Sequence, residues 1–393
     1  MPGPLDGIRV IDCTSMISGP LATMLLGDQG ADVVKVETPG VGDLVRHMGA
    51  GRRGMAPTFA TGNRNKRSIA LNLREERGKE LLLQLVSGAD VFVQNFRPGT
   101  AERMGIGEAA LRQVRPDLVY VSISGFGETG PYRDKRVYDP LVQALSGLAS
   151  IQGAAEGRPR MVRLIVPDKL TAMTAAQAIT AALFARQRGE GGQHVHLSML
   201  DAMVAFLWPE GMVGYTWLGD ETSRSRIQLA QDLIFETQDG FMTAGTVSDA
   251  EWQGFCRAVD HREWQDDERF ATTSARVTHV ESRLTLMGEA LLTRSTSEWL
   301  ERLDAEQVPC APVLSRAELL GHPQIAANEL IEESQHPHAG PMRQPRPAAR
   351  FDATPASIRR PAPLLGEHTN ELLGELGLAG EEIAALRESG VVA

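Results

Sequence analysis

An Asp at the start of a helix is the first residue in this chain that could do chemistry. Residues 162–169 read VRLIVPDK, a pattern that predicts a largely apolar strand ending in Pro167 and Asp168, before a helix that begins at Thr171. Most Asp residues in this position are structural N-caps. The alternative is a nucleophile, because a carboxylate with an ordinary pKa of about 3.9 is ionised at neutral pH and needs no general base. The pattern alone leaves both interpretations open.

Two basic segments could bind an anion. Residues 51–54 (GRRG) and 63–68 (NRNKRS) predict loops in which Arg and Lys stand beside Gly or Asn backbone amides, a good environment for phosphate. From Arg46 to Arg136 there are 16 Lys and Arg against nine Asp and Glu, while the whole chain has a formal net charge of -10. A basic band in an acidic chain indicates a site for an anionic ligand, with solvated helix faces as the alternative. The acidic total argues against a nucleic-acid partner.

Histidine pairs and a glycine motif are weaker signals. His194 and His196, like His336 and His338, alternate along the chain, but no third ligand type follows at a known spacing, so no metal site is predicted. Residues 125–130 (GFGETG) match the GxGxxG motif directly after a predicted strand. However, a proline follows the last glycine, the next segment is charged, and no acidic residue lies about 20 residues further on. The motif therefore predicts a tight glycine loop rather than a nicotinamide site.

Strand and helix patterns alternate along the first half of the chain. The predicted strands are residues 8–12, 32–37, 90–94, 118–124 and 194–197, and the predicted helices are 20–27, 77–87, 108–114 and 171–186. This alternation predicts βαβ units with a parallel sheet, an α/β fold. Residues 225–325 change character, with a hairpin at 233–244 followed by short helices rich in Trp and Arg, which indicates a smaller second domain. Residues 334–363 predict an extended or loop segment, before an acidic helical end.

The cysteines and the N-terminal segment indicate in which cellular compartment the protein is expected. The three cysteines, Cys13, Cys256 and Cys310, are widely spaced and form no CxxC pair, as expected in the reducing cytoplasm and without a zinc site. The first residues, MPGPLDGIRVID, have neither the basic region nor the apolar run typical of a secretion signal. No apolar run reaches 18 residues, so neither a membrane span nor a membrane partner is expected. We therefore expect a cytoplasmic protein.

Several segments, by their order and spacing, carry a resemblance to a known family. They read LDGIRVIDCTSMISGPLATMLLGDQGADVVKVETPGVGD, NRNKRSIALNL, ADVFVQNFRPGTAERMGIG, PDLVYVSISGFGETGPY, RGEGGQHVHLSMLDAM, VPCAPV and LLGEHTNELL. Over nearly the whole chain they resemble the family III CoA-transferases, the CaiB/BaiF group. The resemblance implies an α/β fold: a Rossmann-like large domain with a parallel sheet, built from both chain ends, plus a smaller α+β middle domain, in an interlocked homodimer. It divides the chain into residues 1–224, the N-terminal part of the large CoA-binding domain, 225–330, the small domain, and 331–393, a C-terminal extension returning to the large domain.

The resemblance also implies a reaction, in which CoA moves from an acyl-CoA donor to a small carboxylic acid through a mixed anhydride and an aspartyl-CoA thioester. The family nucleophile falls on Asp168. CoA is a co-substrate, and neither a tightly bound cofactor nor a metal is implied. The arginines among the CoA-binding positions would account for the basic band. The positions implied to bind CoA are Met16, Ile17, Leu71, Asn72, Leu73, Arg74, Asn95, Phe96, Arg97, Arg103, Arg136, Val137, Tyr138 and Asp139.

The chain departs from the family pattern at three places. Thr38 stands where relatives often carry a basic residue, and the glycine-rich loop of formyl-CoA transferases is not evident at residues 225–245. In the related α-methylacyl-CoA racemases a His precedes the Asp that corresponds to Asp139, whereas this chain has Tyr138 there. A racemase-like isomerase and an inactive CoA-binding homologue are therefore the alternatives to a transferase, and Tyr138 counts against the isomerase because a phenol is a poor base at neutral pH.

Overall fold

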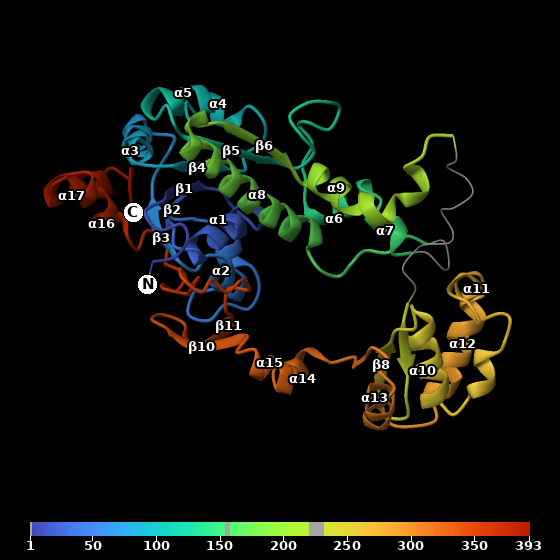
Figure 1. The fold of residues 1–393 in the computed structure, drawn as a ribbon. Helices are drawn as coiled ribbons and strands as arrows, with labels where there is room; N and C mark the ends of the chain where they lie inside the picture. The colour runs from blue at the N-terminus through green and yellow to red at the C-terminus, as the bar shows by residue number, and fades with distance from the viewer. Residues whose placement is uncertain (1, 154–157, 220–231) are drawn as a thin grey trace. The chain divides into compact units, whose positions relative to one another are not determined.

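A parallel sheet lies at the centre of the larger of two compact units (Figure 1). In the part of the chain that the structure describes, its six strands run in the order β3 (Lys66–Ala70), β2 (Asp32–Glu37), β1 (Arg9–Cys13), β4 (Val91–Gln94), β5 (Val119–Ser124) and β6 (His194–Ser198). Every neighbouring pair is parallel. The strand order reverses between β1 and β4, and ligands of such sheets bind outside the carboxyl ends of the strands at that point. The predicted α/β class is confirmed.

The computed structural model describes residues 2–153, 158–219 and 232–393. One unit comprises residues Met1–Pro209 and Glu329–Ala393, and the other comprises Glu210–Asn328. Both ends of the chain thus belong to the larger unit. The boundary predicted at 224/225 lies outside the described residues, and the other was predicted at 330/331. The divisions between the units lie at 209/210 and 328/329.

Two layers of helices cover the parallel sheet. On one face α1 (Ser18–Asp28) packs against α8 (Val166–Ala185), where small side chains such as Ala172 and Ala175 let the helices approach closely. On the other face a larger apolar cluster joins the sheet to α3 (Glu76–Ser87) and α5 (Glu108–Val114). The remaining helices of this unit are α2 (Pro57–Gly62), α4 (Thr100–Arg103), α6 (Asp139–Leu145), α7 (Leu148–Ile151) and α9 (Met199–Gly211), with short turns at Leu44–His47 and Arg186–Glu190.

The C-terminal segment returns to this unit without adding a strand to the parallel sheet. Its helices α16 (Thr369–Glu375) and α17 (Gly380–Glu388) place Leu372, Leu373 and Ile383 in the apolar cluster beneath α3. The segment predicted to be extended or a loop, residues 334–363, contributes to an antiparallel hairpin of β10 (Ile331–His336) and β11 (Gly340–Pro345). The sheet strands therefore come from the N-terminal part alone, while both chain ends build the core around them.

The prediction that residues 63–68 form a phosphate-binding loop is wrong. Most of that segment leads into β3, and its cations are buried and paired with carboxylates. Arg64 pairs with Asp28 at 2.7 Å, and Lys66 Nζ lies 2.9 Å from an oxygen of Asp12. Because these cations are already neutralised, they are not available to an anionic ligand.

The smaller unit has its own core. Its antiparallel sheet has the order β7 (Ile234–Glu236), β8 (Phe241–Ala244) and β9 (Cys310–Pro312), so the predicted hairpin is confirmed. Trp252, Phe255 and Trp299 lie buried at the centre of the core. The helices of this unit are α10 (Asp249–Ala258), α11 (Thr273–Thr278), α12 (Val280–Leu291), α13 (Thr296–Ala305), α14 (Arg316–Leu319) and α15 (Pro323–Ala327), with single turns at Val213–Tyr215 and Arg262–Gln265.

Among the described residues, no helix is both long enough and apolar enough to cross a membrane. Cys13, Cys256 and Cys310 are all free thiols, and the first two are buried.

Candidate active site

The loop between β1 and α1, residues 14–17, lies at the switch point of the sheet and is held by hydrogen bonds to its backbone. The Ser15 N–H donates to Asn95 Oδ1 at 2.9 Å, and the Asn95 amide donates back to the Ser15 carbonyl at 2.7 Å. The Met16 N–H donates to Asp43 Oδ1 at 3.0 Å. Met16 has a φ of 68°, in the left-handed region that costs a non-glycine residue about 1–3 kcal/mol. The surrounding bonds therefore hold the loop in a strained conformation.

Four buried charges lie beneath this loop. Lys35 Nζ donates to Asp43 Oδ2 at 3.0 Å and to the Thr14 carbonyl at 2.9 Å, while Lys66 pairs with Asp12. Burial acts to raise the pKa of Asp12, but the two ammonium groups lower it well below its ordinary value. Burial lowers the pKa of Lys66 to about 8. We call Asp12, Lys35, Asp43 and Lys66 the buried charge cluster.

Asp168 lies in the first turn of α8, which begins at Val166. The predicted strand over residues 162–167 is therefore wrong, because Pro167 stands at a position where its fixed φ favours the start of a helix. The N-cap of α8 is Ile165, so Asp168 does not cap its own helix. The side chain instead lies close to Ser18, at the start of α1, whose hydroxyl and backbone N–H act to lower its pKa.

The surroundings of Asp168 make it a more basic carboxylate than the sequence suggested. Burial and, less strongly, the charge of Asp139 raise the pKa of Asp168 to about 6, while the hydroxyl and backbone N–H of Ser18 act in the opposite direction. The Asp168 N–H donates to Asp139 Oδ2 at 3.3 Å, and burial also raises the pKa of Asp139. At pH 7 a group with a pKa of about 6 is still about 90% ionised. Asp168 is thus an ionised, poorly hydrated carboxylate.

Two cavities adjoin the β1–α1 loop. The first has a volume of about 180 Å³ and contains Asp168 in its wall. The second, of about 770 Å³, lies over the ends of β1 and β2 and the start of α3. Ser15 and Phe96 line both cavities. An extended ligand that occupied both cavities would have one end near a carboxylate and the other end in the larger, basic cavity.

Most residues implied by the family resemblance line these cavities. Arg136 is exposed and Asp139 is buried behind Asp168, and neither belongs to the lining of either cavity. The first cavity takes Met16, Ile17, Asn95, Phe96, Arg97, Val137, Tyr138 and Asp168, and the second takes Leu71, Asn72, Leu73, Arg74, Phe96 and Arg103.

The cations of the basic band fall into two groups. One group forms internal ion pairs, as Arg46 does with Glu37. The other group has no carboxylate within ion-pair distance among the described residues, and most of its members line the cavities. The unpaired members that line a cavity are Arg74, Arg97, Arg103, Arg133 and Lys135.

Sequence reasoning missed several residues of the site. Arg133 and Lys135 lie in the charged loop after the glycine motif, and their place in the basic band was the signal that could have found them. Ser18 gave no signal, because it meets Asp168 only through the packing of α1 on α8. Thr38, noted as a departure, lines the second cavity.

The fold and the two cavities define an α/β protein with a carboxylate in a small cavity that adjoins a larger, basic one. Residues 5–369 match the family described as CoA-transferase family III, and the chain belongs to that family of enzymes. It is 33% identical to the succinyl-CoA:glutarate CoA-transferase of Homo sapiens, over 99% of this chain and 90% of that one. It is 34% identical to a formyl-CoA:oxalate CoA-transferase of Streptomyces avermitilis, over all of both chains. A CAIB/BAIF family protein from Brucella suis has a similar structure, with a TM-score of 0.82, 29% identity, and coverage of 96% of this chain and 100% of that one.

The raised pKa of Asp168 predicts the pH dependence of activity. If the ionised carboxylate is the reacting form, kcat/KM should fall about tenfold per pH unit below pH 6 and stay level above about pH 7. Replacing Ser18 with Ala removes a hydroxyl that lowers the pKa of Asp168, so the midpoint should move to higher pH. A wild-type midpoint near 4, the ordinary value for Asp, would contradict the assignment.

Proposed function

We propose that this protein transfers CoA from an acyl-CoA donor to a carboxylic acid acceptor through covalent intermediates on Asp168. The observation that carries the proposal is the ionised, poorly hydrated Asp168 carboxylate in a cavity that shares Ser15 and Phe96 with a second, basic cavity. Relatives named for succinyl-CoA, glutarate, formyl-CoA and oxalate support small carboxylic acids as the exchanged groups. The acyl-CoA donor and the acceptor acid are the only substrates required, and no tightly bound cofactor takes part.

The proposed reaction proceeds in balanced steps. An oxygen of Asp168 attacks the thioester carbonyl of the donor, the C–S bond breaks, and a mixed anhydride and CoA thiolate result. The thiolate then attacks the side-chain carbonyl of Asp168, the donor acid leaves as a carboxylate, and aspartyl-CoA remains. The acceptor carboxylate reverses both steps. No proton transfer is needed, because nucleophiles and leaving groups are all anions.

Ser18 is the residue proposed to stabilise negative charge during these steps. Its backbone N–H and hydroxyl lie close to the Asp168 carboxylate and act to lower its pKa. They stand at the N-terminus of α1, where the helix dipole favours an anion. Donors fixed in this way can stay in place while the oxyanion forms, and one such donor is commonly worth about 2.7–4 kcal/mol of barrier.

The unpaired arginines are proposed to bind the phosphates of CoA. Arg74 and Arg103 line the larger cavity, which would take the nucleotide end, while Arg97 lines the smaller one. Arg136 is proposed to act from the exposed rim of the site. The other proposed CoA contacts are Met16, Ile17, Leu71, Asn72, Leu73, Asn95, Phe96, Val137, Tyr138 and Asp139.

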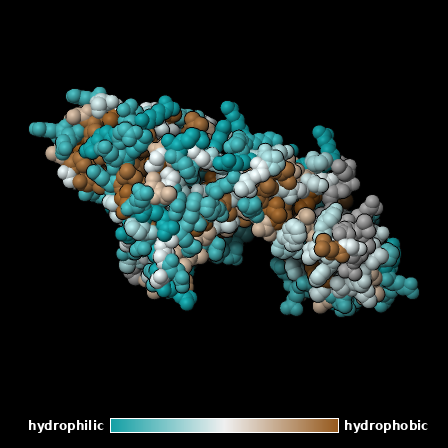
Figure 2. All heavy atoms as spheres, turned by 90° about the horizontal axis from the view of Figure 1, so that it is seen from above, coloured by the Kyte–Doolittle hydropathy of each residue, from teal (hydrophilic) through white to brown (hydrophobic). Residues whose placement is uncertain are grey.

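We further propose that the protein is an interlocked homodimer. Figure 2 shows several patches of hydrophobic atoms on the visible face of the molecule. Met173 and Phe184 on α8 and Phe206 and Trp208 on α9 are between 44% and 63% exposed. Large exposed apolar side chains of this kind usually mark a surface covered by another protein. A second copy of the chain is the proposed cover.

Sedimentation velocity tests the homodimer. The expected result is a single species of twice the chain mass of 42.6 kDa that persists at nanomolar concentration, since interlocked chains cannot separate without partial unfolding. An active species of 42.6 kDa would contradict the proposal.

The variant Asp168→Asn tests the nucleophile. We expect transfer to fall by at least about a thousandfold, as for loss of a catalytic nucleophile, while CoA binding is kept. Since burial raises the pKa of Asp168, its charge destabilises the fold above about pH 6, and the Asn variant should be at least as stable to urea at pH 7.

Mass spectrometry of the acyl-CoA-treated protein identifies the modified residue. Wild type and the matched variant Asp139→Asn should both carry a hydroxylamine-sensitive adduct on the peptide containing Asp168. An adduct on Asp139 in the wild type, or near wild-type transfer by Asp168→Asn, would overturn the mechanism.

Single changes of Arg74, Arg97 and Arg103 to Ala test the phosphate contacts. Each charge-assisted contact is worth about 1.5–3 kcal/mol, so KM for acyl-CoA should rise by about 10- to 100-fold with a smaller change in kcat. Arg77→Ala is the matched control, because Arg77 is exposed on the outer side of α3 and pairs with Glu80. If the control and the three variants have the same KM, the assignment fails.

A further inference from the structure

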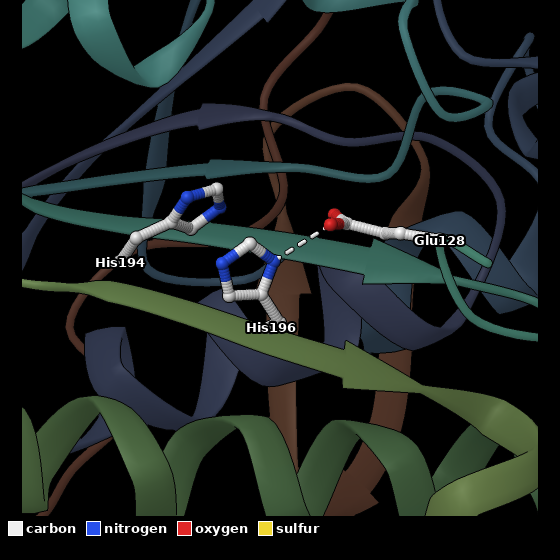
Figure 3. A group of neighbouring side chains, drawn as sticks. All are labelled: Glu128, His194 and His196. Carbon is white, nitrogen blue, oxygen red and sulfur yellow. Dashed lines mark ion pairs between the residues drawn. The ribbon is translucent and has the colours of Figure 1, made fainter.

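A second group of reactive side chains lies outside the cavity of Asp168. His194 and His196 on β6 and Glu128 from the segment after β5 face one another (Figure 3). One ring nitrogen of each histidine and one carboxylate oxygen all lie within 4.8 Å of one another. His196 Nδ1 is 2.9 Å from Glu128 Oε2, and the two imidazole ring centres are 3.6 Å apart. The histidines share a face because alternate residues of a strand point the same way.

The charges around this cluster favour a bound cation. Glu102 and Glu108 line the same cavity of about 620 Å³ as the three side chains, although Arg133 lines it as well. The surrounding charge is therefore mainly negative.

One ligand of the cluster is held by neighbouring hydrogen bonds. A ring nitrogen of His194, Nε2, lies 2.8 Å from Ser122 Oγ, which also accepts from the Gln94 amide at 2.9 Å. Metal-binding histidines are commonly oriented by such outer contacts. In contrast, the side chains of Glu128 and His196 are 41% and 53% exposed, so they can adjust to an incoming ion.

We propose that Glu128, His194 and His196 form a binding site for Zn²⁺ or a similar transition-metal dication. Two imidazoles and one carboxylate form a donor set that suits zinc, and water would complete the coordination. Sequence reasoning predicted no metal because it lacked a third ligand, and Glu128 supplies one from a distant part of the chain. The ion would connect β6 to residues 125–138, the segment that also carries Arg133 and Val137 into the cavity of Asp168. Its role would be to fix that segment rather than to take part in the transfer step.

Titration calorimetry with Zn²⁺ alone, on the full-length protein, tests this site. The expected result is one saturable site per chain, with no comparable binding of Mg²⁺, which prefers oxygen ligands. His196→Ala and Glu128→Gln should each weaken Zn²⁺ binding by about 10- to 100-fold. Zn²⁺ should also raise the melting temperature of the wild type and not that of His196→Ala.

The matched control is His261→Ala, which removes an exposed histidine that also contacts a glutamate, Glu263, in the other unit. It should bind Zn²⁺ as the wild type does. Both positions are exposed, so the variants should fold, and circular dichroism checks this. Absence of saturable Zn²⁺ binding to the wild type, or equal weakening by His196→Ala and His261→Ala, would overturn the proposal.

Discussion

The buried charge cluster is the constraint on which the site depends. Taking an ammonium or carboxylate out of water costs several kcal/mol per ion, and only a well-placed partner offsets that cost. Asp12 on β1, Lys35 on β2 and Lys66 on β3 must therefore come together in one register. With them in place, Lys35 and Asp43 fix the β1–α1 loop, and the loop leads directly to Ser18. The paired charges on three neighbouring strands thus help to fix the position of Ser18, which lies close to Asp168.

The active site gathers features that work against stability. Met16 has a left-handed backbone conformation, and Asp168 loses hydration while facing the charge of Asp139. Such features persist only where the surrounding structure determines them firmly. Here the support is the apolar contact between α1 and α8 on one face of the sheet and the larger apolar cluster on the other. The packing of helices on the sheet therefore stabilises a site whose own backbone conformation and charges reduce stability.

The sequence predicted the elements whose patterns are local. Strands rich in β-branched residues, such as β2 and β5, were found within a residue or two, since both faces of a parallel strand are buried. It missed β3 because Lys66 and Arg67 look like surface residues until their partners, which are distant in sequence, are known. It also took the residues before Pro167 for a strand, because a short apolar run does not distinguish strand from helix entry.

The candidate site, like the fold, could be predicted only in part from the sequence. The family resemblance indicated Asp168 and most of the residues that line the cavities, and the local excess of cations indicated an anion site. What no pattern contained was the environment of Asp168. Its raised pKa results from burial and from the charge of Asp139, and the groups that oppose this rise belong to Ser18, 150 residues earlier in the chain. Properties of this kind are set by packing between elements and not by neighbours in sequence.

The return of the C-terminal segment to the large unit has a consequence for how the chain folds as it is synthesised. Leu81 and Leu85 of α3 pack in the same cluster as Leu372, Leu373 and Val392, and Leu71 forms a bridge with Val392. These partners leave the ribosome some 300 residues later. The smaller unit, Glu210–Asn328, is contiguous, so it can complete its core first. Until the last residues emerge, the apolar face of α3 stays open to water and to chaperones.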